Sequence, residues 1–163
     1  MPQSHQWSHL NKLQIGRYGE YFFKMKFVLH GFDVYSPEVD DRGIDFVLRW
    51  EPNRYWDVQV KSVRDTGYVF FHKSKFRLRP SLLVALAVFE QGHEPNLFLI
   101  PSMKWKNPDG VLVDRDYAGE GQISPPEYGI NVSKKGLKAL EQFRFTDALV
   151  ETIFGTDENK HSF

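Results

Sequence analysis

Four polar residues in the first half of the chain have side chains that suit chemistry on a phosphate: Glu20, Asp45, Gln59 and Lys61. Mg²⁺ takes oxygen ligands, usually one or two carboxylates together with waters and substrate phosphate. A bound metal polarises a phosphate, and a nearby lysine offsets the negative charge that develops during hydrolysis. The residue types therefore indicate metal-assisted chemistry on a phosphate, provided that the fold brings them together.

The segment WDVQVKSV has the pattern of a β-strand with one apolar and one polar face. Side chains in a strand alternate, so Val58 and Val60 point one way while Gln59 and Lys61 point the other. A lysine and an amide on an interior strand are costly to bury without partners, and a carboxylate from a neighbouring strand is the least costly partner. Asp45 is the candidate, because it stands between two apolar residues where a structural strand would place an apolar residue or a surface threonine.

Glu20 belongs to a segment with the apolar spacing of an amphipathic helix, Leu10 to Leu29, which ends at Gly31. Gly16 and Gly19 precede Glu20, and each glycine weakens a helix by about 1 kcal/mol relative to alanine. Glycines also let another backbone come close. We therefore expect this part of the helix to approach the sheet, where Glu20 could reach the strand carboxylate.

Short β-rich segments follow the helix and are separated by the turn-forming sequences PEVDDRG and EPN. The expected strands are 32–35, 44–50, 55–63, 68–71, 82–89 and 97–100. The apolar runs at 82–89 and 97–100 suit strands covered on both faces, although a buried helix also fits the first run. Residues 73–79 form a basic loop or a short helix that stops at Pro80.

The second half of the chain ends in a helical region. Asp109-Gly110 indicates a hairpin turn between Trp105 and a strand at 111–113. Ser133 is placed to cap a last helix that breaks near Phe145. The chain of 163 residues suits one core, so we expect a single domain over residues 1–155 and a disordered tail over residues 156–163.

Together the four polar residues, spaced E-x24-D-x13-Q-x-K, resemble the pattern of the PD-(D/E)XK nuclease superfamily. The likeness covers Gln14 to Arg64, including GRYGEYFF, GIDFVL and WDVQVKS, and is similar to Holliday-junction-resolvase-like and Mrr-like members. That family carries a helix Glu, an Asp that opens the second strand, and an acidic-x-Lys pair on the third. Here the pair is Gln59-Val60-Lys61, a QxK variant. The resemblance implies an α/β fold with a restriction-endonuclease-like αβββαβ core, in which helices flank a mixed central sheet.

The resemblance also implies an activity, the hydrolysis of DNA phosphodiester bonds by a metal-dependent endonuclease with Mg²⁺ or Mn²⁺. Asp45 would be the central metal ligand, with the amide oxygen of Gln59 and the carbonyl of Val60 beside it. Glu20 would hold a metal-bound water or a second ion. Lys61 would orient the nucleophile and offset charge in the transition state. Because an amide is neutral, this site would hold metal less tightly than a two-acid version.

Gln59 also favours the main alternative, a catalytically inactive nuclease-fold module that acts in DNA binding or protein interaction. Asp57 would restore the acid count if it reached the ligand position, but it lies two residues along the strand, about 6.6 Å away. Cleavage of RNA is a further alternative. Phosphate-binding loops, dinucleotide-binding glycine motifs, nucleophile elbows and H-E-x-x-H zinc motifs are absent from the sequence.

Basic residues are concentrated in one part of the chain. The whole sequence carries 21 basic and 21 acidic residues, so its net charge does not indicate a nucleic-acid partner. Between Lys61 and Arg79, however, six basic residues stand against one acid, Asp65. A local basic surface can hold phosphate, although an ordinary amphipathic edge shows the same alternation. The candidate DNA contacts are Lys73, Lys75, Arg77 and Arg79, near the aromatic residues Tyr68, Phe70, Phe71 and Phe76.

Composition narrows the cellular setting. The absence of cysteine removes disulfides, thiolate zinc sites and a cysteine nucleophile. The polar start lacks a secretion signal, and the longest apolar run is too short to span a bilayer. We therefore expect a soluble, cytoplasmic protein without membrane contact. A small nuclease domain with one site needs two copies to cut both strands of DNA, which favours a homodimer.

Overall fold

The computed structural model describes residues 4–39 and 41–155, and its first element is helix α1 (Lys12–Leu29). Asn11 caps this helix. Its side chain accepts from the backbone N–H of Gln14 at 2.9 Å, and the Gln14 side chain accepts from the backbone N–H of Asn11 at 2.8 Å. Gly31, with a φ of +85°, adopts the left-handed conformation just after the helix. The buried residues of α1 are Ile15, Gly19, Phe23 and Phe27.

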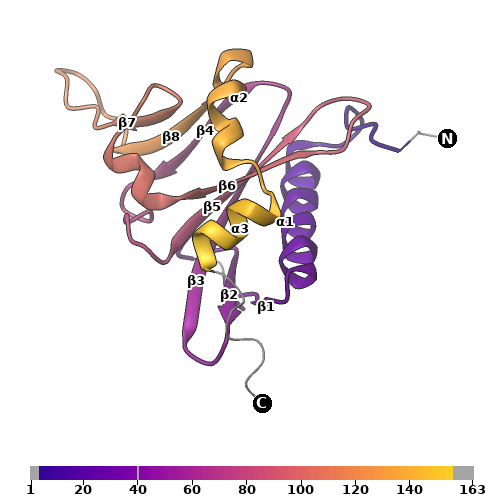
Figure 1. The fold of residues 1–163 in the computed structure, drawn as a ribbon. Coiled ribbons are helices and arrows are strands. Elements are labelled where there is room, and N and C mark those ends of the chain that lie inside the picture. Colours follow the sequence, from indigo (N-terminus) through magenta and orange to yellow (C-terminus); the bar gives the residue numbers. More distant parts are fainter. Residues whose placement is uncertain (1–3, 40, 156–163) are drawn as a thin grey trace.

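A mixed sheet of five strands, in the order β1-β2-β3-β5-β6, forms the central layer (Figure 1). Its strands are β1 (Asp33–Tyr35), β2 (Phe46–Trp50), β3 (Arg54–Arg64), β5 (Leu82–Phe89) and β6 (Asn96–Pro101). The β3–β5 pair is parallel, and the other pairs are antiparallel. Strand β3, which carries the predicted site residues Gln59, Val60 and Lys61, therefore has a hydrogen-bonded neighbour on each side.

A smaller antiparallel sheet, in the order β4-β8-β7, packs on one face of the central sheet. Its strands are β4 (Gly67–His72), β7 (Leu112–Arg115) and β8 (Glu127–Val132). The other elements are the 3₁₀ helices η1 (Ser102–Lys106) and η2 (Glu141–Phe143), and the helices α2 (Lys134–Leu140) and α3 (Asp147–Phe154). Figure 1 shows the small sheet and α1 on different sides of the central strands.

Two apolar cores lie on the two faces of the central sheet. Along β5, Leu83 and Ala85 pack with α1 and α3, whereas Leu82 and Val84 pack with the small sheet, η1 and α2. All eight residues of β5 are buried, as expected for a strand that is covered on both faces. The molecule thus has three layers, with α1 and α3 on one face of the central sheet and the small sheet, η1 and α2 on the other.

The expected fold class is confirmed, because a mixed central sheet is flanked by helices. All six expected strands form, and the run at 82–89 is a strand and not a helix. One connection differs from the αβββαβ order. The chain passes from β3 to the parallel strand β5 through β4 and the irregular segment 73–81, where that order has a helix. The pairing of β4 with β8 accounts for the difference, since it draws this connection into the small sheet.

The predicted hairpin after Trp105 is wrong. Trp105 lies in η1, where its buried indole N–H donates to the carbonyl of Gly129 at 3.0 Å. Asp109 does form a turn, since its Oδ1 accepts from the backbone N–H groups of Val111 and Leu112 at 3.0 and 2.8 Å. The strand that follows pairs with β8. A long-range partner for the tryptophan therefore overrides the local hairpin signal.

The last helical region breaks near Phe145, as predicted. Ser133 caps α2 by accepting from the N–H of Gly136 at 2.9 Å, and the N–H of Phe145 donates to the carbonyl of Leu97 at 2.8 Å before α3 begins. The predicted tail, residues 156–163, lies outside the described residues. Among the described residues, no helix combines the length and the apolar character needed to cross a membrane.

Gly19 and Gly16 provide a matched test of how α1 packs on the sheet. A Cβ on Gly19 would lie 2.2 Å from Oγ of Ser62, whereas nothing lies within 4 Å of a Cβ on Gly16. We expect Gly19→Val to lower the free energy of unfolding by about 1–3 kcal/mol, the usual cost of overpacking. Gly16→Val should change it by less than about 0.5 kcal/mol. Urea unfolding measures both values, and equal effects would contradict close packing at Gly19.

Candidate active site

Asp45 stands at the point where β2 begins and separates from β3. Its backbone N–H donates to the carbonyl of Val58 at 2.9 Å, and its Oδ2 accepts from the backbone N–H of Val60 at 2.6 Å. A main-chain carbonyl would accept this bond if the strands stayed paired, so the carboxylate replaces it. Because the N–H and C=O of a strand residue point to the same side, the Val60 carbonyl faces the same gap. The junction therefore places a carboxylate next to a main-chain oxygen.

The side chain of Gln59 lies beside this junction, against Gly43. A Cβ on Gly43 would lie 3.3 Å from Nε2 and 3.8 Å from Oε1 of Gln59, and the φ of Gly43 is +72°. Both the close approach and the left-handed conformation favour glycine here. The amide of Gln59 is thus held against the turn that leads into Asp45.

Lys61 lies on the polar face of β3, half-buried against β4. Its Nζ is 5.0 Å from the ring centroid of Phe71 and 6.0 Å from that of Phe70. Burial lowers the pKa of the Lys61 ammonium below its ordinary value of 10.5; the negative charge of Asp45 opposes this shift, and the positive charge of Lys12 adds to it. Lys61 is therefore not an exposed lysine on an edge strand, and it is electrostatically coupled to Asp45.

Glu20 is paired with two cations on α1. Its Oε2 is 2.9 Å from Nη1 of Arg17, and its Oε1 is 2.9 Å from Nζ of Lys24, which also donates to Oγ of Ser36 at 2.8 Å. Within residues 4–39 and 41–155, no group of three or more acidic, histidine or cysteine side chains is placed to hold a metal ion. The predicted residues Asp45, Gln59 and Lys61 thus gather around the β2–β3 junction, whereas Glu20 is paired on the neighbouring helix.

Asp57, the alternative acid, has a different partner. Its Oδ2 accepts a short hydrogen bond from Nη2 of Arg79, and in the sheet register it lies opposite Val47. A carboxylate that is already paired with a guanidinium is a poorer ligand for a cation. This pairing favours Gln59 over Asp57 as the neighbour of Asp45 in the candidate site.

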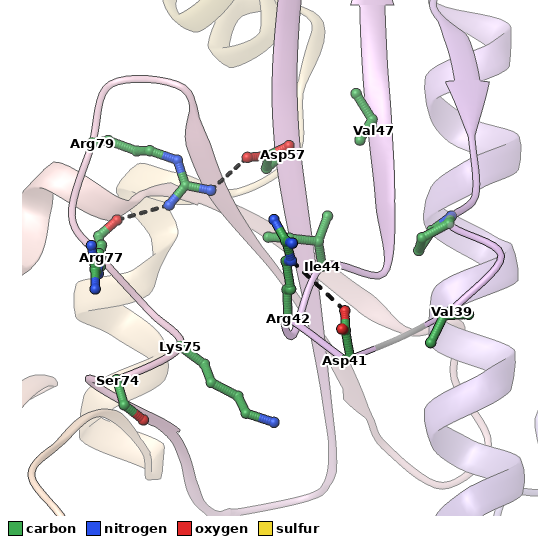
Figure 2. A pocket seen from close by; sticks show the side chains of 11 residues that line it. Val39, Asp41, Arg42, Ile44, Val47, Asp57, Ser74, Lys75, Arg77 and Arg79 are labelled. Carbon is green, nitrogen blue, oxygen red and sulfur yellow. Dashed lines mark hydrogen bonds and ion pairs between the residues drawn. The ribbon is translucent and has the colours of Figure 1, made fainter.

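An open cleft of about 750 Å³ adjoins the start of β2 (Figure 2). Three of the four predicted DNA contacts, Lys75, Arg77 and Arg79, line it together with Arg42. The guanidinium of Arg79 donates to the Asp57 carboxylate. It also donates to the carbonyl of Arg77 at 3.0 Å. Figure 2 shows the Lys75 side chain extending toward the opening between the segment that carries it and the one that carries Arg42. Asp41 and Asp57 also line the cleft, so four basic residues stand against two acids. We call it the basic cleft, and its excess of positive charge suits a phosphate backbone.

Lys73, the fourth predicted contact, lies apart from the basic cleft. Its Nζ donates short hydrogen bonds to Asp114 and Asp116, and it is 4.6 Å from the ring centroid of Tyr128. Burial opposes the charged form, but the two carboxylates outweigh burial and raise the pKa of Lys73. Because two acids already neutralise it, Lys73 is less suited than Lys75 to bind phosphate.

Three residues of the site region were not selected from the sequence. Arg42 lines the basic cleft, Gly43 contacts Gln59, and Lys12 acts on Lys61 through its charge. The glycine of the DDRG turn carried a signal, since a turn glycine two positions before a predicted ligand indicates a close approach or a left-handed conformation. Nothing in the spacing indicated Lys12, because its proximity to β3 depends on how α1 packs.

Comparisons with known proteins agree with this geometry at the level of the fold. No family model and no curated protein matches the chain. Among solved structures, Hjc of Archaeoglobus fulgidus, a Holliday junction resolvase from an archaeal hyperthermophile, matches with a TM-score of 0.50 and 11% sequence identity over 85% of this chain and 94% of that chain. The chain has a restriction-endonuclease-like fold. Within this fold, the QxK variant and the roles of single residues stay predictions.

The coupling of Lys61 to its charged neighbours predicts opposite pKa shifts in two variants. Asp45→Asn keeps a hydrogen-bond acceptor but removes a negative charge, so the pKa of Lys61 should fall further. Lys12→Gln removes a repelling cation, so that pKa should rise. The exposed Asp33→Asn serves as a control and should leave it unchanged. NMR titration of labelled lysine side chains measures the three values, and a pKa indifferent to both neighbours would contradict the described geometry.

The same pKa depression links stability to pH. The pKa of Lys61 is lower in the folded protein than in the unfolded chain. At a pH between these two values, the unfolded chain holds the proton on Lys61 and the folded protein does not. The contribution of Lys61 to the free energy of unfolding therefore rises with pH in that range.

Proposed function

We propose that this protein is a metal-dependent endonuclease that hydrolyses phosphodiester bonds of DNA. The observation that carries the proposal is the β2–β3 junction, where the Asp45 carboxylate bonds to the N–H of Val60 at 2.6 Å and is electrostatically coupled to the half-buried Lys61. A carboxylate, neutral oxygens and an ammonium are the groups that metal-assisted phosphate hydrolysis uses. The restriction-endonuclease-like fold is consistent with this activity.

The oxygen atoms at the junction fit a hard divalent cation. Asp45, the amide oxygen of Gln59 and the carbonyl of Val60 would hold Mg²⁺ or Mn²⁺. Such an ion, when bound, polarises a phosphate and lowers the pKa of a coordinated water. Because one of these three ligands is charged, we expect weak binding in the absence of DNA, with substrate phosphate adding further oxygen ligands.

Lys61 is proposed to orient the attacking water and to offset the charge that develops on the phosphate. Its contacts with two phenylalanine rings restrict the ammonium before substrate arrives. Partial burial makes its charge more effective than the same charge in bulk water. Glu20 is proposed to hold a water molecule or a second ion at the edge of the site, after exchange of one of its two ion pairs.

The basic cleft beside the junction supports a nucleic-acid substrate, and the resemblance to the nuclease family favours DNA over RNA. Lys75, Arg77 and Arg79 line the cleft, and contacts from such side chains to phosphates position a nucleic acid without reading its sequence. Hjc is a Holliday junction resolvase, so we extend the proposal to branched or otherwise structured DNA. One site cuts one strand, and we therefore propose a homodimer for cleavage of both strands.

One observation favours the alternative of an inactive nuclease-fold module that binds DNA or protein. Glu20 is held by Arg17 and Lys24, and Gln59 contributes no charge, which leaves Asp45 as the acid at the junction. Under this alternative, the basic cleft would bind DNA and divalent metal would have no effect on that binding.

We expect the intact protein to cut supercoiled or branched DNA with Mg²⁺ or Mn²⁺, and Asp45→Asn and Lys61→Ala each to reduce the rate by about 100-fold or more. The matched control is Asp33→Asn, which removes an exposed acid from an edge strand and should keep full activity. Gel assays of DNA cleavage measure the rates. Cutting that survives both site substitutions would disprove the proposed site. No cutting by any variant, together with tight DNA binding, would favour the inactive module.

A further inference from the structure

A second hollow, of about 350 Å³, adjoins Lys61. We call it the aromatic groove and define it by Lys12, Lys61, Tyr68 and Phe70, which line it. Strand β3 runs from Asp57, at the basic cleft, to Lys61, at the aromatic groove. The two hollows therefore lie on either side of the candidate active site along this strand.

The wall of the groove is a pair of aromatic rings on β4. Tyr68 and Phe70 stack at 6.4 Å with an interplanar angle of 18°, and Phe70 is 42% exposed. The Tyr68 hydroxyl donates to the buried Glu127 at 2.7 Å, and its ring lies so close to Gly129 that a Cβ there would be 2.1 Å from the hydroxyl oxygen. Arg115 lies 4.6 Å from the Tyr68 ring centroid. Tyr68 is thus fixed, and it supports an exposed phenylalanine in a defined orientation.

The charge in the groove is positive. Lys12 is exposed, and it is close enough to Lys61 to affect its ionisation. Arg64 also lines the groove, but its Nη1 donates to the carbonyls of Trp7, Ser8 and Leu10, so it holds the segment before α1. Among the described residues, those that line the groove include no acid. Lys12 is therefore available for an anionic group of a ligand.

We propose that the aromatic groove binds an unpaired nucleotide of the nucleic-acid substrate, with its base stacked on Phe70 and its phosphate beside Lys12. The proposal rests on the proposed nuclease function and narrows its substrate class. Stacking on an aromatic side chain is tolerant of base identity, because every base has a flat π face.

A paired base cannot fill this groove. In a duplex each base is stacked on its neighbours, and it must leave the stack before a side chain can cover its face. The groove volume lies at the lower end for small-molecule sites, which suits one nucleotide and is too small to enclose a double helix. The proposed substrate therefore has duplex or backbone in the basic cleft and an unpaired nucleotide next to Lys61, as at a fork, flap or junction.

The test measures binding without metal, so that it does not depend on cleavage. A short single-stranded oligothymidylate with 2-aminopurine at alternate positions reports stacking through quenching of its fluorescence. We expect the intact protein to quench it in EDTA, and Phe70→Leu to abolish the quenching and weaken single-strand binding about tenfold. Affinity for a blunt duplex should stay the same. Because Phe70 is 42% exposed, the substitution does not open the core.

Two further variants sharpen the result. Tyr35→Leu removes an aromatic ring that is 46% exposed on β1, away from the groove, and should change neither quenching nor affinity. Lys12→Gln should keep the quenching but reduce the salt dependence of single-strand binding by about one phosphate contact.

Quenching that persists in Phe70→Leu, or an equal loss of duplex and single-strand affinity, would overturn the proposal. Failure here differs from failure of the nuclease. If the protein cuts DNA with Mg²⁺ but does not quench the probe, the proposed nuclease function stands and the proposal for the aromatic groove fails. If the protein quenches the probe through Phe70 but cuts no DNA, the aromatic groove stands as a binding site and the proposed catalysis fails.

Discussion

The hydrogen bond between the Asp45 carboxylate and the N–H of Val60 is the interaction on which the candidate site depends. Where β2 leaves β3, the sheet loses the main-chain acceptor for Val60, and an unpaired N–H inside a sheet is costly. The side chain of Asp45 supplies the acceptor at 2.6 Å. A structural requirement of the sheet thereby fixes a negative charge at one point of the fold, beside the main-chain oxygen and the amide that would share a cation with it.

The layered architecture determines which groups surround the Asp45 carboxylate. Because β3 has hydrogen-bonded neighbours on both sides, and because the rings of Phe70 and Phe71 on β4 lie close to Lys61, this lysine is half-buried rather than extended into water. Burial lowers the pKa of its ammonium, and the charge of Asp45 opposes part of this shift. The nearby rings restrict the position of the ammonium. The two hollows along β3 differ in character. The basic cleft has four basic residues and two acids in its lining, whereas the aromatic groove is lined by aromatic rings and basic residues, with no acid among the described residues. A strand of nucleic acid that spans both would pass the junction.

Local pattern was enough to predict much of the fold. The apolar run of β5, the strand alternation that places Gln59 and Lys61 on one face, and the break near Phe145 all depend on neighbours in the sequence. The ion pairs of Glu20 lie three and four residues away on α1 and were accessible to the same reasoning. The partners of Lys73, by contrast, come 41 and 43 residues later, so only the assembled sheet brings them together. The small sheet, which replaces an expected helix between β3 and β5, has the same long-range origin.

The proposed site requires Asp45, Gln59 and Val60 to share one divalent cation at the β2–β3 junction. Anomalous diffraction at the manganese edge, from crystals of the protein grown with Mn²⁺ and a branched DNA, tests it directly. We expect a manganese peak bounded by the Asp45 carboxylate, the amide oxygen of Gln59 and the carbonyl of Val60. A peak elsewhere on the chain, or no peak at the junction when DNA occupies the basic cleft, would contradict the proposed site.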